Sequence, residues 1–419
     1  MAESMHLTRL CRALLPLSAA ALLASCGGGG GSSASAPQNV TVTAGDTQVT
    51  ITWTQESGVT YWLWYDEGTT VSTTSKTAST KVQSMVTPYT LSGLTNGTTY
   101  TFALNGRVDG GEGGPLSTAV TVTPRLAGAT WNTGGSLGST EMRGLSYGTA
   151  SDSTTYTYVA VGAGGVKYKS TDGKTWTAIT SNTATDFNAS VYGLGYYLAV
   201  GNSGLIQYSS DISTWTTATS NTTNALNALG YSGGSVVAVG DSGTLRYSTN
   251  GTSWNTSTSP TTANLRGIAY SAQGVWVAVG DGGALITSTD GVNWTARSSG
   301  TTNNLRGVTA LTSTINSVTT YMLVAVGDNG TVLFSNDGVT WTTKSSGTTE
   351  QLNSVAVIAS ATTATRFVAA GNNGVIITSE DGSTWTARSS GTSANLREVR
   401  RYANVFTALG SAGTSVYSY

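Results

Sequence analysis

The sequence predicts an all-β protein in which a small β-sandwich precedes a seven-bladed β-propeller. Residues 36–124 alternate apolar and polar positions in short runs, which is the period-2 pattern of strands. The second half repeats an element of the type "AVGDGG" seven times. Seven tryptophans follow the same period, at spacings of 39 to 47 residues: Trp131, Trp176, Trp215, Trp254, Trp294, Trp341 and Trp385. A period near 40 with four short strands per unit is typical of a β-propeller.

The composition narrows the function classes. Of 419 residues only 10% are charged, and the formal net charge is −1. A nucleic-acid-binding protein would need a basic face, so we expect no nucleic-acid partner. The abundance of glycine, serine and threonine suits a β-rich extracellular protein with many tight turns.

The first 35 residues read as a signal followed by a tether. Arg9 and Arg12 precede the apolar run "ALLPLSAAALLA", and "LASC" ends it at Cys26. We assign residues 1–25 to a signal peptide. Residues 26–35 are rich in glycine and serine and form a flexible tether.

The "LASC" tetrapeptide, Leu23 to Cys26, resembles the lipobox of bacterial lipoproteins. This resemblance implies that Cys26 is lipidated, that residues 1–25 are removed, and that several acyl chains anchor the protein to a membrane. Gly27 follows the cysteine, which in that family suggests sorting to the outer membrane, so we expect a cell-envelope location. The alternative is an ordinary secretory signal with Cys26 near the cleavage site by chance.

The scarce residues exclude several kinds of site. The single histidine, His6, and both cysteines, Cys11 and Cys26, lie in the first 26 residues. A chain cleaved before Cys26 therefore cannot form a Ser-His-Asp or Cys-His site, a zinc site with His or Cys ligands, or an internal disulfide. We expect no metal and no cofactor, and any catalysis would need Asp, Glu, Tyr, Lys or Arg.

Residues 36–124 resemble a fibronectin type III domain. Pro37 opens the segment, Trp53 lies on its second predicted strand, and "LSGLTNGTTYTF" contains Tyr100 at the position of the family's corner tyrosine. The resemblance implies that the Tyr100 hydroxyl bonds to the backbone. Such domains are mostly spacers.

We assign residues 128–419 to the propeller. From residue 264 one unit contains "NLRGIAYS", "GVWVAVG", "ALITS" and "NWTARSS" as four successive strands. The last unit stops at its third strand, "TSVYSY", and "ATWNTGG" around Trp131 is a fourth strand with no unit before it. We therefore expect the segment around Trp131 to close the last blade, which leaves no exposed edge in the ring.

Between the third and fourth strands lies a turn of the type "STDGVNW". It resembles the Asp-box of bacterial sialidases, shortened by one residue, and in that family the box is structural. We expect a type I′ turn with positive φ at both central residues, and we expect the copy "SSDISTW", which lacks the glycine, to be the least regular. The residues at the Asp position are Asp172, Asp211, Asn250, Asp290, Asp337 and Asp381.

The whole repeat resembles photosystem II assembly factor-like propellers, which implies a scaffold or binding role. Each inner strand carries one polar residue near the same mouth of the channel: Arg143, Asn188, Asn227, Arg266, Arg306, Asn353 and Arg397. The loops from second to third strand add Ala163, Asn202, Asp241, Asp281, Asp328, Asn372 and Ser411.

Two interpretations of this polar mouth remain open. The arginines either bind an anion, since guanidinium groups match carboxylate, sulfate or phosphate, or they pair with loop aspartates, as Arg266 with Asp281 and Arg306 with Asp328. Arg143 and Arg397 are the better candidates for anion binding, because their own blades offer Ala163 and Ser411 in place of an aspartate.

We predict a monomeric, surface-anchored, non-enzymatic lipoprotein whose mouth binds a protein partner or an anionic glycan. No catalytic residue is assigned. The alternative is a glycoside hydrolase or lyase of the sialidase-like propeller type. It would use carboxylates near the mouth, and Glu141, Asp186 and Glu350 are the candidates.

Overall fold

The computed structural model describes residues 33–71, 80–315, 318–358, 365–402 and 405–419. All regular elements in these ranges are strands and three-residue 3₁₀ turns, which confirms the all-β fold. Cys26 and the signal peptide lie outside the described residues, so lipidation stays a prediction. The described part contains no helix long and apolar enough to cross a membrane.

The N-terminal domain contains two β-sheets. One has the order β1-β2-β5, with β1 Thr41–Gly45, β2 Gln48–Thr52 and β5 Tyr89–Ser92. The other has the order β4-β3-β6-β7, with β3 Val59–Glu67, β4 Thr80–Met85, β6 Tyr100–Val108 and β7 Val120–Val122.

Alternate residues are buried in β2, whereas β6 is buried continuously from Tyr100 to Gly106. Trp53 follows β2, is buried, and lies with its ring centroid 5.4 Å from that of Tyr61. Tyr100 is also buried, and its hydroxyl donates to the Glu67 carboxylate at 3.3 Å. The bond from this hydroxyl to the backbone stays a prediction.

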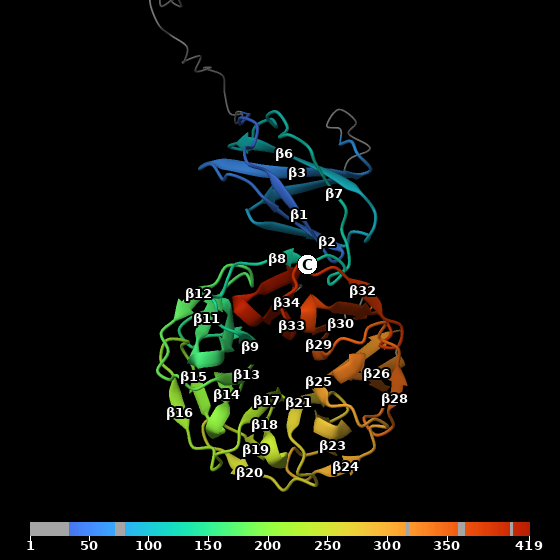
Figure 1. Ribbon diagram of the computed structural model, residues 1–419. Coiled ribbons are helices and arrows are strands. Elements are labelled where there is room, and N and C mark those ends of the chain that lie inside the picture. The colour runs from blue at the N-terminus through green and yellow to red at the C-terminus, as the bar shows by residue number, and fades with distance from the viewer. Residues whose placement is uncertain (1–32, 72–79, 316–317, 359–364, 403–404) are drawn as a thin grey trace, which may run out of the picture. The chain divides into compact units, whose positions relative to one another are not determined.

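The second domain is a ring of seven four-stranded sheets, the blades (Figure 1). Inner strands of successive blades contact one another, and β33 of blade 7 contacts β9 of blade 1. From the inside outward the strands of blades 1 to 4 are β9 Met142–Thr149, β10 Tyr156–Gly162, β11 Lys167–Ser170, β12 Thr177–Ile179; β13 Phe187–Gly193, β14 Tyr196–Gly201, β15 Ile206–Ser209, β16 Thr216–Ala218; β17 Leu226–Tyr231, β18 Val236–Gly240, β19 Leu245–Ser248, β20 Asn255–Thr256; and β21 Leu265–Ser271, β22 Val275–Gly280, β23 Leu285–Ser288, β24 Thr295–Arg297.

Blades 5 to 7 follow the same order, and a 3₁₀ turn separates the second and third strands of every blade. The strands are β25 Leu305–Ile315, β26 Val318–Gly327, β27 Val332–Ser335, β28 Thr342–Lys344; β29 Leu352–Ile358, β30 Arg366–Gly371, β31 Ile376–Ser379, β32 Thr386–Arg388; and β33 Leu396–Tyr402, β34 Val405–Gly410, β35 Ser415–Ser418 with β8 Asn132–Thr133 outermost. The turns η1 to η7 are Ala163–Gly165, Asn202–Gly204, Asp241–Gly243, Asp281–Gly283, Asp328–Gly330, Asn372–Gly374 and Ser411–Gly413.

The apolar second strands explain why the repeat is so regular. In β22, Val277 and Val279 pack against blade 5. Trp276 and Ala278 lie on the opposite face of the sheet and pack against blade 3. All four are at most 1% exposed. A strand buried on both faces needs a continuous apolar run rather than alternation, and each core cluster therefore lies between two blades.

The turn between third and fourth strands, here called the SxDGxxW turn, is held by its own side chains. In blade 4 the Asp290 carboxylate accepts from the backbone N–H groups of Val292 and Asn293, both at 2.8 Å. Ser288 Oγ accepts from the Gly291 N–H at 2.8 Å, and Trp294 Nε1 donates to the Gly291 carbonyl. The N–H donors lower the pKa of Asp290. These contacts serve the turn itself.

The prediction of a type I′ turn is wrong. Gly291 has φ of 75°, but Asp290 is not among the residues with positive φ. The side-chain caps bend the chain, so only the second central residue needs the left-handed region. The copy without glycine keeps the pattern: Ile212 adopts φ of 70°, and its carbonyl accepts from Trp215 Nε1 at 2.8 Å. The expected irregularity consists of this strained φ and of a missing hydrogen bond, because the other five complete turns join the N–H of the Asp or Asn to the serine Oγ and the Asp211 turn does not.

The seventh SxDGxxW turn is shared between two distant parts of the chain. β8 pairs with β35, so Thr133 lies opposite Val416. Gly128 N–H donates to Ser418 Oγ at 2.8 Å, and Trp131 Nε1 donates to the Gly128 carbonyl at 2.9 Å. These bonds repeat those of Ser288, Gly291 and Trp294, although 290 positions separate Gly128 from Ser418.

We expect Ser418→Ala to lower the free energy of unfolding by about 1–2 kcal/mol, because the buried Gly128 N–H loses its acceptor. Urea unfolding followed by tryptophan fluorescence measures this. The exposed Ser213→Ala is the control and should change the free energy by less than about 0.5 kcal/mol. Identical unfolding curves for wild type and Ser418→Ala would mean that this bond does not hold the ring closed.

Candidate functional site

Seven polar side chains gather at one mouth of the propeller channel. Each occupies the second residue of an inner strand, directly after an apolar residue that is fully buried, as Leu265 precedes Arg266. All seven are half-buried and line one cavity of about 110 Å³. They are the residues predicted from the sequence: Arg143, Asn188, Asn227, Arg266, Arg306, Asn353 and Arg397.

A β-bulge positions each of these side chains. In blade 4, Leu265 pairs with Gly280 and Gly267 pairs with Val279, which leaves Arg266 without a partner residue on β22. The same register shift occurs at all seven ring residues. A bulge redirects the side chain of the extra residue, so the repeat places seven side chains in equivalent orientations.

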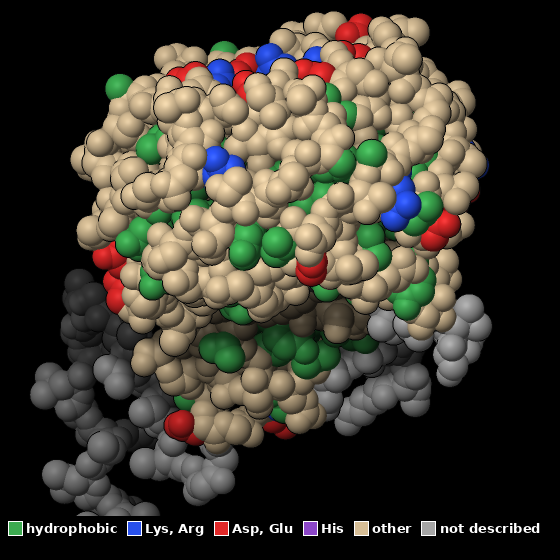
Figure 2. Space-filling view, turned by 90° about the horizontal axis from the view of Figure 1, so that it is seen from below, with side chains coloured by type: hydrophobic (Ala, Val, Ile, Leu, Met, Phe, Trp, Pro, Cys, Tyr) green, Lys and Arg blue, Asp and Glu red, His purple; other side chains and the backbone are tan. Residues whose placement is uncertain are grey.

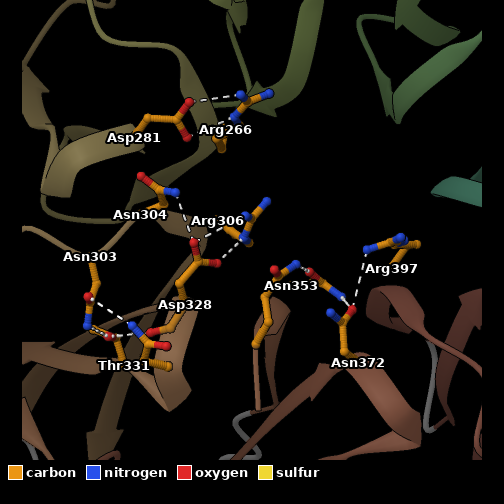
Figure 3. A network of polar contacts seen from close by, with 12 residues as sticks. Arg266, Asp281, Asn303, Asn304, Arg306, Asp328, Thr331, Asn353, Asn372 and Arg397 are labelled. Atoms are coloured by element: carbon orange, nitrogen blue, oxygen red, sulfur yellow. Dashed lines mark hydrogen bonds and ion pairs between the residues drawn. The ribbon is translucent and has the colours of Figure 1, made fainter. Parts of the chain in front are cut away.

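Two of the predicted ion pairs are present. Arg266 binds Asp281 through two nitrogens, at 3.0 and 2.8 Å, and Arg306 binds Asp328 at 2.5 and 3.3 Å. Figure 3 shows each aspartate facing the arginine of its own blade. Asp241 of the neighbouring blade lies 3.6 Å from Arg266 Nη1.

The expectation that Arg143 and Arg397 lack a carboxylate partner is wrong. Glu141 binds both, with Oε1 at 2.7 Å from Arg143 Nε and Oε2 at 2.9 Å from Arg397 Nε. Burial alone would raise the pKa of Glu141, but hydrogen bonds from the two guanidinium groups outweigh it and lower that pKa. One carboxylate thus joins blade 7 to blade 1.

The three asparagines of the ring tie neighbouring blades together. Their amide nitrogens donate to the carbonyl of the buried leucine that begins the next inner strand. The distances are 3.1 Å from Asn188 to Leu226, 3.0 Å from Asn227 to Leu265 and 2.8 Å from Asn353 to Leu396. These side chains have a structural role that the sequence pattern did not reveal.

The carboxylates proposed for hydrolysis are engaged in other contacts. Asp186 accepts from the Gly164 N–H at 2.7 Å, and this bond together with Arg143 lowers the pKa of Asp186. Asn304 makes the same contact with the Gly282 N–H, so the position caps a loop. Glu350 accepts from Asn373. A general acid needs a raised pKa, and neither Glu141 nor Asp186 has one.

The cavity contains one charged pair that sequence reasoning missed. Glu398 and Arg400, on the inner strand of blade 7, form an ion pair, and Ser354 Oγ donates to Glu398 at 3.0 Å. Burial raises the pKa of Glu398, and Arg400 and Ser354 oppose that shift. An alignment of the repeats contains the signal, because the other inner strands carry a small residue at the position of Glu398: Gly144, Ala189, Ala228, Gly267, Gly307 and Ser354.

The cavity lining is therefore rich in positive charge. It includes five arginines, the four of the ring and Arg400, but only one carboxylate, Glu398. The carboxylates that pair with the ring do not line the cavity, but they lie within 3.6 Å of its arginines and offset much of that charge: Glu141, Asp186, Asp241, Asp281 and Asp328. Among the described residues no group of His, Cys, Asp or Glu has the arrangement of a metal site.

One face of the molecule carries few charged side chains. In Figure 2 uncharged side chains and backbone dominate, and charged groups of both signs gather along the upper edge of the view. This distribution agrees with the low charge content of the sequence.

Comparison with known proteins supports the two folds. Residues 35–123 match the fibronectin type III domain family. A solved structure described as YCF48 bound to D1 peptide is 16% identical, covers 71% of this chain and 98% of its own, and has a TM-score of 0.55. YCF48 from Cyanidioschyzon merolae is also 16% identical, over 70% of this chain and 99% of its own, with a TM-score of 0.53.

A more distant propeller has the same shape. The WD40 β-propeller domain of Doa1 is 12% identical, covers 70% of this chain and 97% of its own, and has a TM-score of 0.52. At these identities the likeness shows the fold alone. A search of curated proteins found no match.

Proposed function

We propose that the protein is a non-enzymatic scaffold of the cell envelope, anchored through Cys26, whose propeller mouth binds a carboxylate-bearing segment of a protein partner. The observation that carries this proposal is the cavity with five arginines and one carboxylate in its lining. Guanidinium groups bind carboxylates through paired hydrogen bonds, especially where the groups are held in place. Here the loop aspartates and Glu141 hold four of them.

The size of the cavity limits the ligand. A volume of about 110 Å³ is equivalent to a few water molecules, at about 30 Å³ each. A single carboxylate group suits a cavity of this size better than a large ligand does. We therefore expect an acidic side chain or a terminal carboxylate to enter the cavity, with the rest of the partner over the mouth.

Similar propellers support a protein partner. One structure with this fold is described as YCF48 bound to D1 peptide, so a propeller of this shape can bind a peptide. An anionic glycan is the second candidate, because the carboxylate of an acidic sugar presents the same group to the arginines. The lowered pKa values of Glu141 and Asp186 disfavour the hydrolase alternative.

A binding screen tests the proposal. The chain from Ser32 onward is presented to peptides that end in a free carboxylate, to the same peptides with an amidated end, to peptides with internal acidic residues, and to acidic glycans. We expect the wild type to bind carboxylate peptides. Arg143→Ala and Arg397→Ala should each lower the affinity at least about tenfold, because each removes at least one charge-assisted hydrogen bond to the ligand. Arg297→Ala, on an outer strand, is the matched control and should bind normally.

Glu141→Gln makes the screen sharper, because it releases two guanidinium groups from their carboxylate. We expect this variant to bind carboxylate peptides more tightly than wild type. Peptide binding that ignores all three substitutions would refute a role of the mouth. Binding confined to glycans would replace the protein partner with the second candidate.

A further inference from the structure

A second cavity lies on blade 6, away from the mouth. It has a volume of about 420 Å³ and is formed by the strands β30, β31 and β32 and by the SxDGxxW turn that contains Asp381. Its lining includes Arg366, Arg388 and the hydroxyl groups of Thr378, Thr384 and Thr386. Small-molecule sites have volumes of about 300–1,000 Å³, so this cavity is large enough for a ligand.

Arg366 is unusually buried for a charged residue. Its side chain is only 4% exposed, and its Nη2 donates to Glu380 Oε1 at 2.8 Å. Its Nε and Nη1 have no hydrogen-bond partner within the part of the chain that the structure describes. Both nitrogens are enclosed, and buried donors without an acceptor are unfavourable, especially on a charged group.

The other blades show that the fold does not need this arginine. At the position of Arg366 they carry Thr157, Tyr196, Ser235, Val275, Met322 and Val405. At the position of Glu380 the other five complete turns carry Thr171, Ser210, Thr249, Thr289 and Asn336. Both members of the buried pair are therefore specific to blade 6, and the formation of a blade does not require them.

A second guanidinium group faces the same cavity. Arg388 Nε donates to Thr378 Oγ1 at 2.9 Å, which orients its side chain. Burial lowers the pKa of Arg366; Glu380 opposes that shift and Arg388 adds to it, so the two arginines are close enough to repel. The Asp381 carboxylate is occupied by the N–H groups of Ser383 and Thr384, which leaves the half-exposed Glu380 as the main competing anion.

We propose that the blade 6 cavity binds the sulfate or phosphate group of a small molecule. The oxyanion takes the place of the Glu380 carboxylate at Arg366 Nη2 and accepts further hydrogen bonds from Arg388 and the threonine hydroxyls. The cavity is larger than a single oxyanion, so the group is carried by a molecule such as a sugar.

Isothermal titration calorimetry with the chain from Ser32 onward tests this, using sodium sulfate, inorganic phosphate and glucose 6-phosphate at constant ionic strength. Glucose is the uncharged comparison. We expect sulfate and glucose 6-phosphate to bind and glucose not to bind, with glucose 6-phosphate tighter than inorganic phosphate. Arg388→Gln should weaken binding at least about tenfold, and Glu380→Gln should strengthen it severalfold.

Two control variants distinguish binding in the blade 6 cavity from binding at a lone arginine or at the mouth. Arg297 makes the same bond to Thr287, at 2.9 Å, that Arg388 makes to Thr378, but without a buried arginine beside it, so Arg297→Gln should bind as wild type does. Arg397→Ala reports on the mouth. Oxyanion binding that is lost in Arg397→Ala but kept in Arg388→Gln would assign it to the mouth and refute the proposal, as would the absence of any binding. Neither result bears on whether the mouth binds peptides.

Discussion

Replacing Gly283 with alanine is expected to lower the free energy of unfolding by more than about 4 kcal/mol, the range of exceptional single mutations. Gly283 ends the turn η4 with φ of 74°, and a Cβ atom there would lie 1.9 Å from the Thr301 carbonyl oxygen. That oxygen belongs to the backbone of the next loop, so it cannot move aside without shifting the mouth. The left-handed φ adds strain for any L side chain.

The preceding glycine is a matched control within the same turn. Gly282 has φ of 65°, but nothing lies within 4 Å of a Cβ built there. Blade 7 carries Ala412 at this position with φ of 53°. Gly282→Ala should therefore change the free energy by about 1 kcal/mol or less. Chemical denaturation of both variants measures the difference, and equal stabilities would show that close backbone approach does not govern the turn.

Replacing Lys167 with methionine is expected to stabilise the protein at pH 7 by about 2–3 kcal/mol. Lys167 is 1% exposed, and its amine contacts Ser181 Oγ at 3.2 Å and the rings of Phe187 and Trp215. Five other blades carry an aliphatic residue here: Ile206, Leu245, Leu285, Val332 and Ile376. Methionine has a similar length and removes the buried charge.

The pH dependence distinguishes this effect from packing. Burial lowers the pKa of Lys167 to about 8, whereas an exposed lysine has a pKa of about 10.4. Between these values the unfolded chain holds more protons, so the stability of the wild type rises with pH over that window. The advantage of Lys167→Met should be full below pH 8 and disappear by about pH 10.5. Urea unfolding at pH 7 and pH 10.5 measures it, and an advantage independent of pH would show that burial of the charge is not its cause.

The sequence was sufficient to predict the blades because six of the seven are built from strands that lie within about 40 residues of one another, and the seventh has the same pattern split between two parts of the chain. The apolar run of a second strand, such as Val275–Gly280, and the capped turn at Asp290 form from neighbouring positions in the chain. The seven copies repeat the same pattern. The pairing of Arg266 with Asp281 could be predicted for the same reason, since both residues belong to one blade.

The ion pairing around Arg397 required the structure. Glu141 reaches Arg397 across the closure of the ring, 256 positions away in the chain, and no periodicity relates the two. The asparagine ties are also contacts between blades, as from Asn353 to Leu396. The β-bulge that directs each ring residue depends on the register of two strands, which the alternation pattern does not specify.

The sequence by itself determined the all-β fold, the number of blades and the positions of the seven ring residues, because these depend on local periodicity and turn chemistry. Only the tertiary structure decided which charged groups line the cavity and which carboxylates pair with them. Electrostatic interactions depend on distances in space, and the closed ring brings the carboxylates of one blade to the arginines of the next. For the same reason the buried Arg366 could be recognised only after its surroundings were known.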